Sequence, residues 1–140
     1  MTLSNDQIKE REMLLFGKKL TDKDYLGGVV RFDEITIPTA QRLIELGYLE
    51  PTERQNESPT AETMIEWGKK WNDKYGLPIV FVHGYVVSHK REDCRITLEG
   101  IRCFWLGLPN LREMIDDFIN QFRNADEFSY DEEHGFCWWD

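Results

Sequence analysis

The chain has 140 residues, of which 41% are hydrophobic and 31% are charged. This composition excludes an intrinsically disordered chain and predicts a single globular domain over residues 1–140. The 26 acidic residues outnumber the 17 Lys and Arg residues, and the resulting net charge of −9 disfavours binding to nucleic-acid phosphates.

The first half of the chain predicts two helices and a short strand. Ser4 is expected to cap the first helix, with Gln7 as its capping-box partner. The β-branched and aromatic residues of 29–32 can form a short strand. The segment that follows Pro38 predicts a short helix, which ends at Gly47.

Residues 79–101 predict a β-hairpin, with a first strand rich in β-branched and aromatic residues. In its second strand Ile96 and Leu98 share one phase of the alternation, but the apolar residues from Ile101 onward are in the opposite phase. We therefore expect a β-bulge or strand break at Gly100. Because both faces of the first strand are apolar, we expect a central strand that is covered on both sides.

Two longer helices flank this hairpin along the chain. The first is expected over residues 59–75, with Ser58 as its N-cap and Pro59 at its first position. The second, over residues 110–123, has apolar residues at helical spacing and a polar opposite face. We expect the second helix to cover one face of the sheet, and the first to cover the other face or an edge.

Together these elements predict an α+β fold. Its small antiparallel sheet is centred on the 79–101 hairpin and packed by the amphipathic helices at about 59–75 and 110–123, with N-terminal helices before them. Residues 127–140 add a final hairpin that turns at 133–135. The segments QNESPT and HGYVVS resemble parts of small bacterial proteins, a resemblance that implies no role for any residue.

The acidic C-terminal end is the most distinctive surface that the sequence predicts. Residues 126–140 carry six acids and no Lys or Arg. Trp138 and Trp139 are adjacent on a predicted strand, so their side chains must point to opposite faces. One of the two then needs cover from elsewhere in the chain or from a partner, and Trp often anchors interfaces.

Basic residues between 69 and 102 give a local positive charge of +3. Lys90, Arg91 and Arg95 lie around the turn of the hairpin, where a winged helix-turn-helix protein would contact DNA. The helix that would read the DNA carries several acids, however, so nucleic-acid binding is a less favoured alternative. The same patch could instead receive the acidic tail.

Motifs with a defined chemistry are few. His83 lies in the middle of the most apolar strand, where it is either a structural residue or the centre of an enzyme pocket. The three cysteines and the turn residues His89 and His134 match no metal-ligand spacing, so we expect no metal and no cofactor. The cysteines fit reduced thiols of a cytoplasmic protein, and no apolar run approaches the roughly 20 residues of a membrane span.

The leading hypothesis is a small acidic protein-interaction or regulatory module rather than an enzyme. Its partner, or a second copy of the chain, would bind a C-terminal surface made by Asp131, Glu132, Glu133, Trp138 and Trp139. The alternatives are a nucleic-acid binder that uses the basic 69–102 region and an enzyme with a pocket centred on His83.

Overall fold

Four helices and five strands make up the fold of residues 2–140, the part of the chain that the structure, a computed structural model, describes. In chain order they are α1 (Asn5–Phe16), β1 (Val29–Thr36), α2 (Ile37–Glu45), α3 (Ala61–Tyr75), β2 (Val80–Val87), β3 (Ile96–Phe104), α4 (Leu111–Phe122), β4 (Glu127–Tyr130) and β5 (His134–Trp138). The strands form one antiparallel sheet in the order β1-β2-β3-β5-β4. The predicted α+β class is confirmed, with the β2–β3 hairpin at the centre of the sheet.

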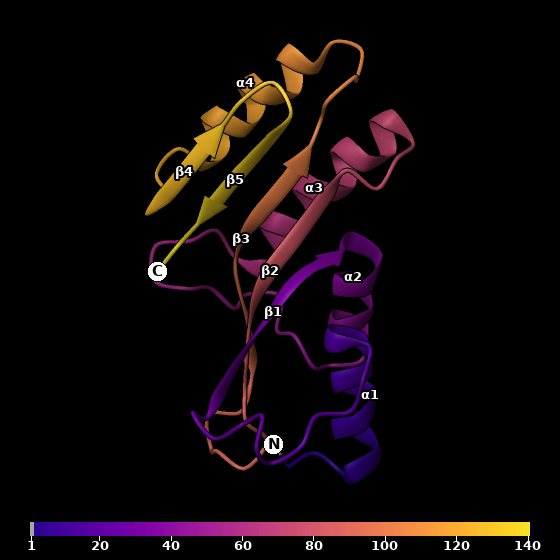
Figure 1. The fold of residues 1–140 in the computed structure, drawn as a ribbon, viewed down its shortest axis with the longest axis vertical. Helices are drawn as coiled ribbons and strands as arrows, with labels where there is room; N and C mark the ends of the chain where they lie inside the picture. The colour runs from indigo at the N-terminus through magenta and orange to yellow at the C-terminus, as the bar shows by residue number, and fades with distance from the viewer. Residues whose placement is uncertain (1) are drawn as a thin grey trace.

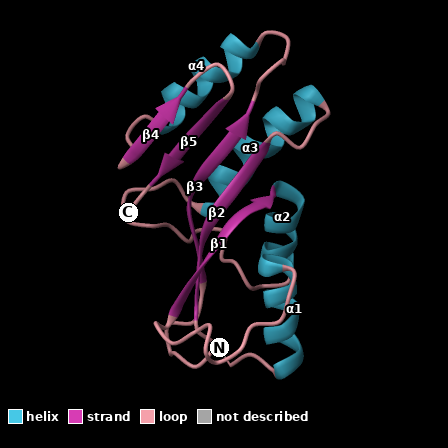
Figure 2. Ribbon diagram, viewed as in Figure 1, coloured by secondary structure: helices cyan, strands magenta, loops and turns pink. Residues whose placement is uncertain are grey.

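The helices lie on one face of the sheet, and the other face has no helical layer (Figures 1 and 2). Helices α3 and α4 are neighbours on the covered face, because the Trp67 ring packs against both Phe118 and Phe122. The prediction that the helix at 59–75 covers the opposite face or an edge of the sheet is therefore wrong, since α3 contacts the inner strands β2 and β3 on the same face as α4. The apolar second face of β2 is covered instead by side chains of adjacent strands, such as Phe104 against Phe81.

The predicted irregularity in the second strand of the hairpin is confirmed. His83 pairs with Gly100 and Gly84 pairs with Leu98, so Glu99 is the extra residue of a β-bulge. The bulge reverses the alternation and keeps the apolar residues on both sides of it in the core. Gly100 has to lack a side chain, because a Cβ atom there would collide with the Cys137 carbonyl oxygen and lie 2.8 Å from the His83 ring.

Helix boundaries follow the capping residues. The Ser4–Gln7 capping box of α1 is present as predicted. Helix α3 begins later than predicted, because Thr60 is its N-cap and accepts a hydrogen bond from the Thr63 amide. The Ser58 hydroxyl instead accepts from the Gln55 amide, at 2.8 Å, within the preceding turn.

The final hairpin is confirmed, with its turn at residues 131–133, slightly earlier than predicted. Strand β5 lies inside the sheet between β3 and β4 rather than at its edge. Cys137 and Trp139 are consequently part of the core. None of the helices within residues 2–140 has both the length and the apolar character that crossing a bilayer requires.

Candidate functional site

A depression of about 420 Å³ lies on the sheet face that has no helical cover. Four strands contribute side chains to its lining. We call its principal members the open-face cluster: Arg31, Glu34, His83, Glu99, Arg102, Phe136 and Trp138.

Strand register brings these residues together from four distant parts of the sequence. Arg102 of β3 lies opposite Phe136 of β5, and Trp138 lies opposite Gly100. Gly100 is also the partner of His83 on β2, so it lies between His83 and Trp138 and adds no side chain of its own. Strand alternation then directs these side chains away from the helices.

Glu99 is the buried hub of one half of the cluster. Its side chain is 2% exposed and accepts hydrogen bonds from Arg31 Nε at 3.1 Å and from Trp138 Nε1 at 3.0 Å. The hydrogen bond to Glu99 raises the pKa of Arg31 above its ordinary value. The carboxylate is satisfied, whereas the Arg31 side chain remains 65% exposed and available to a ligand.

His83 occupies the middle of the cluster as a neutral imidazole. Its ring stacks on Phe136 with centroids 5.2 Å apart and planes 12° apart. Nε2 lies 3.2 Å from the Cys137 carbonyl oxygen, and since a carbonyl only accepts, Nε2 carries the proton. Burial lowers the pKa of His83 below 6.5, more than the hydrogen bond to Cys137 and the charge of Glu99 raise it.

Arg102 and Glu34 form the other half of the cluster. Their side chains make an ion pair across β2. The Arg102 guanidinium also lies 4.6 Å from the centroid of the Phe136 ring, a cation–π contact. The open-face cluster therefore contains three aromatic rings, those of His83, Phe136 and Trp138, and two arginines, each already paired with one carboxylate.

The structure separates the residues of the predicted C-terminal surface. Trp138 is half-buried on the open face, whereas Trp139 is 1% exposed and packs against Phe122, so Trp139 cannot contact a partner in this fold. Asp131, Glu132 and Glu133 form an exposed acidic turn at the end of the β4–β5 hairpin. Hydrogen bonds to Asp131, led by the one from the His134 side chain, lower its pKa to about 2.

The basic residues of the predicted patch are each paired with a carboxylate. Lys90 pairs with Asp22, Arg91 with Asp93, and Arg95 with both Asp93 and Glu53. The other basic residues of the 69–102 region also have partners: Lys69–Asp73, Lys70–Asp117, Lys74–Glu113 and Arg102–Glu34. No unneutralised basic surface forms from these seven side chains.

Metal-ligand clusters and accessible thiols are few in the part of the chain that the structure describes. No group of three His, Cys, Asp or Glu side chains within residues 2–140 is arranged to hold a metal ion. Burial raises the pKa of Cys103 well above its ordinary value and that of Cys137 to about 12. Cys94 is only half-buried and is the accessible thiol of the three.

Sequence reasoning found His83 and Trp138 but not the side chains that join them. Arg31 and Phe136 lie on strands whose pairing partners could not be identified from their own sequences. Glu99 carried a signal, since it interrupts the phase of β3 one residue before Gly100. No family model, no curated protein and no solved structure matches the chain.

Proposed function

We propose that the protein is a protein-interaction module that binds a basic polypeptide on its open sheet face. The observation that carries the proposal is the open-face cluster, a sheet face without helical cover that bears Trp138, Phe136, Arg31 and Arg102. Trp and Arg are the residue types most enriched among the side chains that dominate binding energy at interfaces. The proposed surface includes Trp138, as the sequence hypothesis did. It is centred on the open face of the sheet rather than on the acidic turn at residues 131–133.

Trp138 is the proposed anchor. Its indole Nε1–H is held by buried Glu99, and the Arg31 guanidinium lies 5.8 Å from its ring centroid. A ring that is fixed before binding loses little rotamer entropy when a partner packs against it. The depression beside it offers space for a side chain of the partner.

The charge distribution favours a basic partner. Every basic side chain of the 69–102 region is internally paired, but Glu127, Glu132 and Glu133 form no ion pair with residues 2–140. Glu127 lies opposite Trp138 in the β4–β5 register, directly beside the proposed anchor. A second copy of the chain would bring like charges together, which disfavours self-association through this face.

Binding to defined peptides tests this proposal. A set of basic peptides with one aromatic residue each, matched with acidic versions of the same peptides, is titrated into the protein by calorimetry. We expect binding to basic members only, and about a 30-fold loss of affinity in Trp138→Ala, which corresponds to about 2 kcal/mol at an interface anchor. Leu77→Ala, which truncates an apolar side chain 49% exposed in the α3–β2 loop, is the matched control and should bind as the wild type does.

Nuclear magnetic resonance locates the binding surface in the same experiment. The indole Nε1–H signal of Trp138 should shift on peptide addition, together with amides around His83 and Phe136. The proposal fails if the shifts map to the helical face, if Trp138→Ala binds as tightly as the wild type, or if acidic peptides bind equally well.

An enzyme centred on His83 is the second candidate, because the depression around this ring is lined by three carboxylates, Asp33, Glu34 and Glu99. Neutral His83 donates through Nε2, and Nδ1, which makes no hydrogen bond with residues 2–140, is left as a base. This candidate predicts turnover that His83→Gln abolishes and Trp138→Ala reduces through substrate affinity. A nucleic-acid binder is less favoured, because Lys90, Arg91 and Arg95 are already neutralised by carboxylates.

A further inference from the structure

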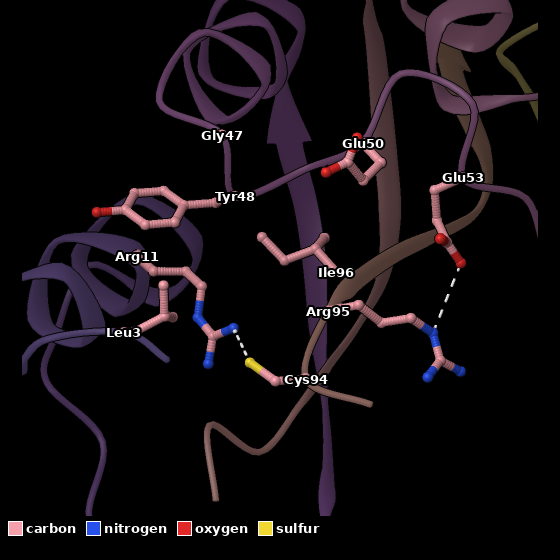
Figure 3. A pocket seen from close by; sticks show the side chains of 9 residues that line it. All are labelled: Leu3, Arg11, Gly47, Tyr48, Glu50, Glu53, Cys94, Arg95 and Ile96. Carbon is pink, nitrogen blue, oxygen red and sulfur yellow. Dashed lines mark hydrogen bonds and ion pairs between the residues drawn. The ribbon is translucent and has the colours of Figure 1, made fainter. Parts of the chain in front are cut away.

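A second cavity, of about 90 Å³, lies between α1, the segment after α2 and the start of β3 (Figure 3). It shares no residue with the open-face cluster. Arg11 and Cys94 meet at its wall, with Tyr48 and Ile96 beside them.

Arg11 is a buried cation that forms no ion pair with a carboxylate of residues 2–140. The residue is 1% exposed, and its Nη1 donates to Cys94 Sγ at 3.1 Å. Nε and Nη2 are buried and have no hydrogen-bond partner within residues 2–140. The carboxylate of neighbouring Glu12 is occupied by the Leu20 amide at 3.0 Å and the Tyr25 hydroxyl at 2.7 Å.

An unpaired guanidinium in the protein interior is strongly unfavourable, so the position of Arg11 next to a sulfur atom calls for a partner that the reduced thiol does not supply. Cys94 is also the cysteine that reagents can reach, since Cys103 and Cys137 are both fully buried. A partly exposed thiol beside a cation is the environment in which cysteines react with electrophiles.

We propose that Cys94 is an oxidation site and that Arg11 binds the oxygen that oxidation adds to its sulfur. The oxidant is a hydroperoxide, ROOH. The Cys94 sulfur attacks the terminal peroxide oxygen, an S–O bond forms while the O–O bond breaks, and the thiol proton passes to the departing alkoxide. The products are Cys94 sulfenic acid and the alcohol ROH, or water when the oxidant is hydrogen peroxide.

The oxidised side chain supplies the acceptor that Arg11 lacks. A sulfenate or, after a second equivalent of peroxide, a sulfinate adds oxygen to Sγ, which lies 3.1 Å from Arg11 Nη1, and so brings an acceptor to a guanidinium whose Nε and Nη2 have no hydrogen-bond partner within residues 2–140. Hydrogen bonds from the guanidinium to this oxygen are charge-assisted, and such bonds are stronger than a bond to a neutral thiol. No second thiol competes for the sulfenic acid within the fold, because Cys103 lies at the far end of β3 and Cys137 on the interior strand β5.

Trapping experiments on the full chain test the proposal. The protein is exposed to substoichiometric hydrogen peroxide with dimedone present, and peptide mass spectrometry locates the adduct. We expect the adduct at Cys94 and none at Cys103 or Cys137. Cys94 should form it at least about tenfold faster than the same cysteine in a peptide of residues 90–98, KREDCRITL, which has the local sequence but not Arg11.

Two variants test whether Arg11 causes the faster reaction of Cys94. Arg11→Met removes the buried cation and should reduce the rate to that of the peptide, whereas Arg11→Lys should retain part of the enhancement. Lys90→Met is the matched control, since it removes a nearby cation that is paired with Asp22, and it should react at the wild-type rate. The wild-type comparison with the peptide remains decisive if Arg11 variants fail to fold.

Three outcomes would contradict a role for Arg11 and Cys94 in oxidation. The proposal is overturned if Cys94 in the folded protein reacts no faster than in the peptide, if the adduct forms first at a buried cysteine, or if folded Arg11→Met reacts at the wild-type rate.

Discussion

Trp138 and Trp139 are neighbours in the chain, but their side chains lie in different environments. Alternation along an extended strand sends one ring to the open face and the other into the core, where it meets Phe122. The sequence was sufficient to predict that the two rings separate. Which ring enters the core depended on the pairing of β5 with β3, which no local pattern specifies.

Truncating each ring should therefore have different consequences for stability. Trp139→Ala empties a core position and should lower the free energy of unfolding by about 3–5 kcal/mol. Trp138→Ala removes a half-buried ring and its hydrogen bond to Glu99, with an expected loss of about 1–2 kcal/mol. Urea denaturation followed by circular dichroism measures both losses, and equal losses would contradict the assignment of Trp139 to the core.

His83 makes stability depend on pH in a defined direction. Its pKa is lowered in the folded protein, whereas in the unfolded chain it titrates at about 6.5. The unfolded chain therefore binds the proton first, so stability is complete above about pH 6.5 and declines as the pH falls from there towards the folded pKa. Carboxylates such as Asp131 titrate lower and contribute outside this window.

Removal of the imidazole should reduce the loss of unfolding free energy as the pH falls. We expect His83→Gln to lose less stability than the wild type between about pH 7 and pH 5.5, measured by urea denaturation at each pH. The ring protons of His83, followed by nuclear magnetic resonance, should titrate below 6.5. A ring that titrates at or above this value would contradict the proposed neutral imidazole.

Among the elements, the β-bulge of β3 could be predicted and the placement of the helices could not. The bulge was visible because the apolar phase changes beside Gly100, a purely local signal. Helical periodicity identifies the apolar face of a helix but not the face of the sheet on which it packs. Apolar residues on both faces of β2 suggested two helical layers, whereas aromatic contacts between adjacent strands cover its second face.

The bulge depends on the absence of a side chain at Gly100. Gly100→Ala would push a Cβ atom into the Cys137 carbonyl oxygen and the His83 ring, so β5 would have to shift away from β3. We expect a loss of at least about 2–3 kcal/mol of unfolding free energy. Gly27→Ala is the control and should change stability little, because a Cβ atom added there would meet nothing within 4 Å and the backbone is not left-handed.

The last two strands are structural elements as well as part of the proposed binding surface. Deletion of residues 126–140 would remove β4, the interior strand β5 and Trp139. We expect this deletion to abolish cooperative unfolding, because β3 and α4 would each lose a packing surface. A truncated protein that retains a sharp thermal transition would show that the rest of the chain folds without this hairpin.

At the scale of the whole molecule, the net charge of −9 is unevenly distributed, because some charges are paired and others are not. Bases of the 69–102 region are paired with carboxylates, whereas Glu127, Glu132 and Glu133 form no ion pair with residues 2–140. We therefore expect these three acids to produce a negative field around the C-terminal hairpin. The sequence revealed the excess of acids at the C-terminal end. It could not reveal the pairing of the bases, since most partners come from distant parts of the chain.

This field should accelerate association with a basic peptide. Raising the ionic strength is expected to slow association markedly while changing dissociation much less, because screening weakens long-range steering more than close contacts. Stopped-flow measurements on the wild type and on a variant with Glu127, Glu132 and Glu133 changed to Gln separate the two rates. Association that is independent of salt in both proteins would contradict a role for the acidic turn in attracting the partner.

The position of β5 also constrains the order in which the sheet can be completed during synthesis. Strands β1, β2 and β3 precede α4 along the chain, yet the free edge of β3 stays open until β5 has been translated and inserted. A nascent chain that stalls in α4 exposes unpaired backbone amides and carbonyls next to an apolar surface, a template for pairing between chains. Slow translation of the segment after α4 should therefore favour aggregation over folding.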